Sequence, residues 1–173
     1  MLTITVLSIF CLLMVRAAYS DLTSFTLSNR LCLSVALLYP VFLFALYLDG
    51  HGLVWPDILL SLAIAAVIFI LLATLFAFNV MGGGDVKLIP AVALWAGPGH
   101  MLGYLFIMAL LGGVIAAMIL ARNRIKASKY LKSSEIINLS MAQQEESAVP
   151  YGAGIAGGGL YVAYELFSTF TMT

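Results

Sequence analysis

The chain has 173 residues, of which 63% are hydrophobic and only 9% are charged. Soluble domains carry about 25% charged residues, so this composition excludes an ordinary soluble protein and indicates an integral membrane protein. Eight basic and eight acidic residues give a formal net charge of zero, which argues against a nucleic-acid partner. Too little polar sequence is left for a separate soluble domain, so we expect one membrane domain over residues 1–173.

The apolar sequence predicts an all-α fold with six membrane-spanning helices, because each crossing takes about 20 mainly apolar residues. The expected spans run over approximately Leu2–Tyr19, Leu31–Leu48, Ile58–Phe78, Asp85–Ala96, Met101–Ala121 and Pro150–Phe170. A cleaved signal peptide is the alternative for the first span, because small residues near Ala18 resemble a cleavage site. No basic segment precedes the apolar run, so a retained helix is favoured.

The fourth predicted helix is short. The segment Gly97–His100 breaks the uncharged stretch Leu88–Ala121 in two. A helix from Asp85 to Ala96 would extend only about 18 Å, well short of the roughly 30 Å hydrocarbon core. The glycine run before Asp85 must therefore dip below the membrane surface, and we expect Asp85 to be submerged. In the sixth span, the Gly154/Gly158 spacing predicts a close approach between helices.

The lysines and arginines predict the orientation. Six spans with both termini on the outer, periplasmic side place all eight basic residues on the cytoplasmic face. The cytoplasmic loops are then expected at about residues 20–30, 80–87 and 122–149. In the last of these, apolar residues within 136–141 suggest a short helix at the membrane interface.

Two aspartates on the predicted cytoplasmic face are candidate catalytic residues. Asp85 interrupts apolar sequence, where a carboxylate is costly and marks a functional site by default. Asp21 follows the first span at matching depth, so helix packing could bring the two together. Two carboxylates in a poorly solvated site cannot both ionise easily and share one proton, as in aspartic proteases. The ionised group would activate water while the neutral one polarises the scissile carbonyl.

The residues around Asp85 have both functional and structural interpretations. Gly82, Gly83 and Gly84 would permit positive φ and a close approach of backbone. Lys87 would pair with Asp85 or with a substrate carboxylate; a snorkelling interfacial cation is the equal alternative. Glu165 is interpreted as an interfacial residue of the last span. The two cysteines and two histidines lack the spacing of metal ligands, so neither a metal nor a cofactor is expected.

Three segments together resemble the type IV prepilin peptidases, membrane aspartic proteases of the Gly-x-Gly-Asp class. Gly82–Leu88 resembles the second-aspartate motif of that family. Asp21 followed by Asn29 resembles the first-aspartate region, although Leu27-Ser28-Asn29 stands where the family usually has Ile-Pro-Asn. Pro150-Tyr151-Gly152 resembles the start of the family's last helix.

The resemblance implies a multi-pass protein of the bacterial inner membrane that removes the leader peptide of prepilins at the cytoplasmic face, with Asp21 and Asp85 as catalytic residues. It implies a role in type IV pilus assembly and protein secretion. Longer members carry a domain with paired CxxC motifs that also methylates the new N-terminus; this chain has only two cysteines and no such domain. It is similar to the compact branch that serves tight-adherence, Flp-type pili.

Two other classes of function stay open from the residues alone. In a small transporter or channel, Asp21 and Asp85 would relay protons or bind a cation; no internal repeat supports this. In a non-catalytic scaffold subunit of a pilus or secretion system, replacing the aspartates would leave function intact.

Overall fold

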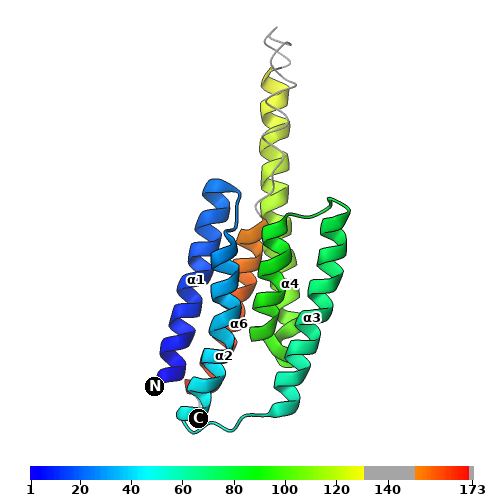
Figure 1. The fold of residues 1–173 in the computed structure, drawn as a ribbon. Helices are drawn as coiled ribbons and strands as arrows, with labels where there is room; N and C mark the ends of the chain where they lie inside the picture. Colours follow the sequence, from blue (N-terminus) through cyan, green and yellow to red (C-terminus); the bar gives the residue numbers. More distant parts are fainter. Residues whose placement is uncertain (131–150, 172–173) are drawn as a thin grey trace.

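The structure is a computed structural model that describes residues 1–130 and 151–171. The described chain is all helical, which confirms the predicted fold class. The helices are α1 (Leu2–Ser24), α2 (Asn29–Leu48), α3 (Trp55–Ala77), α4 (Gly83–Tyr130) and α6 (Tyr151–Thr171). They lie side by side in a bundle with the N- and C-termini at the same end (Figure 1).

Helix α4 folds back on itself at Gly97. This residue has φ 55° and ψ −172°, a backbone conformation outside the helical range. The Tyr104 hydroxyl donates a hydrogen bond to the Ile89 carbonyl over 3.3 Å, whereas a straight helix would separate these residues by about 22 Å. The two halves of α4 therefore pack antiparallel (Figure 1), and the predicted break after Ala96 is confirmed.

By length and composition, four described helices could cross a membrane: α1, α2, α3 and the segment Gly83–Arg122 of α4. Six crossings are not reached by this measure, because the folded-back α4 counts as one helix and α6 is not among the four. The six-span topology and its orientation therefore stay predictions.

Trp95 is the centre of the buried core. Its ring stacks on Phe10 of α1 with 4.2 Å between ring centroids and also meets Tyr39 and Phe42 of α2. Its indole N–H donates to the Val35 carbonyl over 3.1 Å. One side chain of α4 thus joins α1 and α2, with its polar group satisfied as burial requires.

Small residues let α6 pack closely against α4. A Cβ at Gly154 would lie 2.9 Å from the Gly112 backbone nitrogen, and one at Gly158 would lie 2.9 Å from the Tyr104 ring. Such separations leave no room for a side chain. The close helix approach predicted from the Gly154/Gly158 spacing is therefore confirmed.

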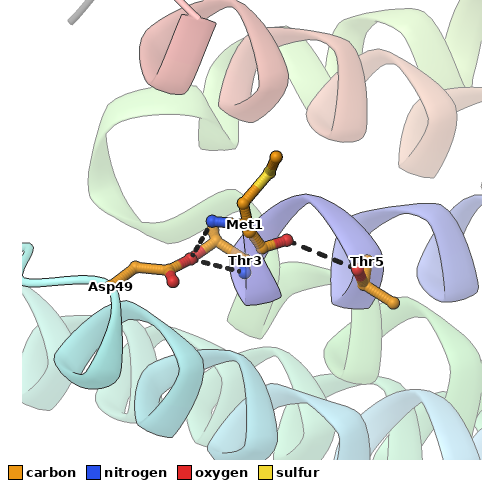
Figure 2. Close-up of polar contacts among 4 residues, drawn as sticks. All are labelled: Met1, Thr3, Thr5 and Asp49. Carbon is orange, nitrogen blue, oxygen red and sulfur yellow. Dashed lines mark hydrogen bonds and ion pairs between the residues drawn. The ribbon is translucent and has the colours of Figure 1, made fainter.

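At the end that holds the termini, Asp49 joins the end of α2 to the start of α1. Its Oδ2 accepts hydrogen bonds from the Met1 amino group, the Thr3 N–H and the Thr3 hydroxyl, all within 2.9 Å (Figure 2). The first N–H groups of a helix have no partner within it. Asp49 supplies one for α1 from another helix.

The loops at the other end are shorter than predicted. Helix α1 continues through Ser24 and α2 starts at Asn29, so the expected loop at 20–30 shrinks to four residues, Phe25–Ser28. The expected loop at 80–87 is also wrong in part, because Gly83 already begins α4. Helix α4 continues to Tyr130, and the rest of the predicted loop 122–149, including the interfacial helix expected at 136–141, lies outside the described residues.

Candidate active site

Asp21 and Asp85 line the same pocket, at the end of the bundle opposite the termini. Its volume is about 430 Å³, and its walls come from the ends of α1, α4 and α6 and the loops between helices. The lining residues are Asp21, Phe25, Thr26, Leu27, Gly82, Gly83, Gly84, Asp85 and Tyr151. The structure thus brings together the two aspartates that the sequence singled out.

Asp21 is held by the start of α6. It lies in the last turns of α1 and is only 5% exposed. Its Oδ2 accepts a hydrogen bond from the Ala153 N–H over 3.1 Å. The first N–H groups of a helix are unpaired and carry the positive end of its dipole, which stabilises a nearby carboxylate. The end of α1 itself is marked by Phe25, whose φ of 50° is left-handed.

The start of α6 leaves no room for a side chain beside Asp21. A Cβ on Gly152 would lie 2.7 Å from the Asp21 Cγ. Tyr151, the first residue of α6, lines the pocket and is half exposed. These two predicted site-shaping residues therefore lie at the pocket, whereas Pro150 lies outside the described residues.

Asp85 lies in the first turn of α4 and is partly buried. The glycines before it would permit positive φ but do not use that freedom, because in the described chain the glycines with positive φ are Gly50 and Gly97. Close packing is what requires glycine here. A Cβ on Gly84 would lie 2.8 Å from the Leu27 Cβ, and one on Gly83 would lie 3.2 Å from the Phe76 ring.

Lys87 contacts Asn29, the first residue of α2. Its Nζ donates a hydrogen bond to the Asn29 Oδ1 over 2.8 Å. In the described part of the chain the ion pair found is between Met1 and Asp49, so the Lys87–Asp85 pairing considered from the sequence is not formed. Two predicted site-shaping residues, 58 positions apart, therefore meet each other rather than the aspartates.

Among the residues that the structure describes, the other acidic residues lie away from the pocket. Asp49 caps α1 at the opposite end, and Asp57 lies in the first turn of α3 at that same end. Glu165, late in α6, is paired with the Tyr161 side chain one turn earlier. Within residues 1–130 and 151–171, no three His, Cys, Asp or Glu residues group as metal ligands.

Sequence reasoning missed one contact of this site. Phe25, Thr26 and Leu27 line the pocket, and they belong to the polar loop Leu22–Asn29, which the sequence predicts to form the groove of the site together with the glycine run. The contact that was missed is Ala153, which binds Asp21 through its backbone N–H. A backbone donor such as Ala153 leaves no signal in residue type.

Residues 8–117, well over half of the chain, match the family model described as the type IV leader peptidase family. The chain belongs to the type IV leader peptidase family. The matched segment of this leader peptidase family member contains both pocket aspartates and Lys87. Neither the curated proteins nor the solved structures compared with the chain gave a match. Family membership makes the chain a leader peptidase-type protease, and its apolar helices make it a membrane protein.

Proposed function

We propose that the chain is an aspartic endopeptidase that removes the leader peptide of prepilins, with Asp21 and Asp85 as its catalytic residues. The observation that carries this proposal is the shared pocket of the two aspartates. They come from helices far apart in the sequence, and both stand at the same end of the bundle. A leader peptidase without a metal or covalent nucleophile needs such a pair to activate water.

The proposed chemistry uses one proton shared by the two carboxylates. The ionised carboxylate takes a proton from water as the water oxygen attacks the scissile carbonyl carbon. The protonated carboxyl donates to the carbonyl oxygen, and the tetrahedral intermediate then collapses as the amine leaves with a proton. Asp21, bound to the start of α6, is suited to carry the negative charge. Asp85 is then the partner that holds the proton.

The proposed membrane placement has six crossings and both termini outside. Support comes from the two antiparallel halves of α4, which run in opposite directions through the bundle, and from α6, a helix of 21 residues. The termini share one end of the bundle, opposite the aspartate pocket (Figure 1). Arg30, in the first turn of α2, and Lys87, in the second turn of α4, both lie at the pocket end, as basic residues of a cytoplasmic face do. The membrane is then the bacterial inner membrane.

The substrates we propose are prepilins of the Flp type, cleaved before their hydrophobic helix. The chain is a single helical unit in its described part, and its two cysteines cannot form the paired CxxC motifs of the methylating members. We therefore propose leader cleavage without methylation, in support of pilus assembly and secretion.

The test is cleavage of a co-expressed Flp-type prepilin, followed by the shift of its band on a gel. We expect wild type to cleave and both Asp21→Asn and Asp85→Asn to lose cleavage by at least about 10³-fold, because either change removes half of the acid–base pair. Asp57→Asn is the matched control, since Asp57 is exposed and lies at the other end of the bundle.

Each other outcome counts against the proposal. Normal cleavage by Asp21→Asn or Asp85→Asn rules out the two-aspartate mechanism. An inactive wild type, present in the membrane at normal level, favours a scaffold subunit. Proton or cation uptake into vesicles that depends on both aspartates, without prepilin cleavage, favours a transporter.

A further inference from the structure

The hydrogen bond between Lys87 and Asn29 joins two helix starts beside the pocket. Asn29 begins α2 directly after Ser28, whose hydroxyl caps that helix by accepting the Leu31 N–H over 3.3 Å. Lys87 lies in the second turn of α4 and reaches Asn29 with its Nζ over 2.8 Å. Both side chains are exposed, so this contact is made at the surface of the bundle.

Two further contacts tie the same helix starts together. The backbone of Gly84 packs against Leu27 so closely that a Cβ would lie 2.8 Å from the Leu27 Cβ. The Cys32 thiol donates to the Gly84 carbonyl over 3.7 Å. The loop Phe25–Ser28 therefore has the start of α4 on one side and, on the other, the last turn of α1 that follows Asp21.

We propose that Lys87 is a positioning residue, which through Asn29 holds the α4 turn bearing Asp85 at its working distance from Asp21. The inference rests on the proposed function. Residues at i and i+2 of a helix do not face each other, so Lys87 points away from the reacting carboxylate. Its effect on the reaction passes through the placement of Asp85, and a displacement of about 1 Å can cost about 10²-fold in rate.

The first experiment measures prepilin cleavage by the full chain in membranes. Lys87→Met keeps the apolar stem and removes the donor, and Asn29→Leu removes the acceptor. We expect each to lower kcat about tenfold or more with KM within about twofold, and the double variant to be no worse than either single one. Lys87→Arg and Asn29→Asp, which keep a donor and an acceptor, retain kcat within about threefold.

Arg30→Met is the matched control, because it removes an exposed positive charge next to Asn29 and leaves the Lys87 contact intact. Equal losses in Arg30→Met and Lys87→Met would show a general charge effect and overturn the proposal. Additive losses in the double variant would also overturn it, since Lys87 and Asn29 would then act independently.

The second experiment does not depend on catalysis. Asp21→Cys and Asp85→Cys are combined in a Cys11→Ser/Cys32→Ser chain, and a short bifunctional maleimide joins the new thiols. We expect Lys87→Met to lower the cross-linking yield several-fold and Arg30→Met to leave it unchanged. An unchanged yield in Lys87→Met overturns the positioning role even if prepilin is cleaved. A lowered yield in Lys87→Met, together with no prepilin cleavage by the wild-type chain, supports the positioning role while the proposed function fails.

Discussion

The backbone N–H of Ala153 donates to the Asp21 carboxylate over 3.1 Å, so the start of α6 is bound to the end of α1. The family match ends at residue 117, before α6 begins. Helix α6, which lies outside the matched segment, therefore supplies a hydrogen-bond donor to Asp21, one of the two pocket aspartates. The start of α6 fits closely against the end of α1, and Gly152 of α6 lies directly beside Asp21 of α1.

Gly152→Ala is expected to lower leader cleavage by about tenfold or more, because its Cβ would lie 2.7 Å from the Asp21 Cγ and force one of the two helices to shift. The measurement is the rate of prepilin processing at equal membrane levels. Gly113→Ala is the control, since a Cβ at Gly113 meets nothing within 4 Å. Equal activity of the two variants would contradict the close fit at Asp21.

Gly84→Ala and Gly82→Ala separate the roles of the glycines before Asp85. At Gly84 the new Cβ would lie 2.8 Å from the Leu27 Cβ, so we expect the start of α4 to be displaced and cleavage to fall about tenfold or more. At Gly82 the nearest atom is the Asp85 Oδ2 at 3.4 Å, an ordinary contact, and cleavage should stay within about threefold of wild type. Processing assays on both variants decide this; a larger loss at Gly82 would refute it.

We expect the stability of the fold to depend on pH through Asp49, at the end of the bundle away from the pocket. Hydrogen bonds from the Met1 amino group, and then from Thr3, hold the pKa of Asp49 well below its usual range. A group with a lowered pKa stabilises the folded state above its unfolded pKa of about 3.9, and this contribution is lost as the pH falls. Asp49→Asn should therefore lower the Tm at about pH 6, and the difference from wild type should shrink towards pH 3.

Thermal unfolding in detergent, followed by tryptophan fluorescence, measures that difference. Asp57→Asn serves as the comparison, because Asp57 is exposed. If the difference in Tm between wild type and Asp49→Asn does not change with pH, the charge of Asp49 is not what stabilises its contact with Met1 and Thr3. Prepilin cleavage near neutral pH should be unaffected, since Asp49 lies at the opposite end from the pocket.

Trp95→Ala is expected to destabilise the fold by about 3–5 kcal/mol, because it leaves a cavity where α1, α2 and α4 meet. In a membrane the loss comes from packing contacts rather than from exposure to water. Reversible unfolding in mixed micelles gives the free energy of unfolding. Trp55→Ala should change it little, since Trp55 is 66% exposed. Similar losses for both tryptophans would contradict the central place of Trp95.

Several features of the fold and site could be predicted from local sequence. Gly97-Pro98-Gly99 marked the fold-back of α4, because such a run cannot continue a helix. The span count placed Asp21 and Asp85 at one end of the bundle, and the shared pocket agrees. By contrast, the end of the first helix was predicted at about Tyr19, whereas α1 continues to Ser24. The last turns of α1 are polar, and their helicity comes from packing on α6.

The sequence by itself determined a helical membrane protein, a break at Gly97 and two aspartates at one end of the bundle, because hydropathy, charge and glycine act locally along the chain. Only the tertiary structure decided the partners: Ala153 for Asp21, Asn29 for Lys87, and Leu27 as the reason for Gly84. Such contacts depend on how helices distant in the chain lie against one another. A backbone N–H donor, or a glycine that leaves room for a neighbouring helix, cannot be recognised from the residue type alone.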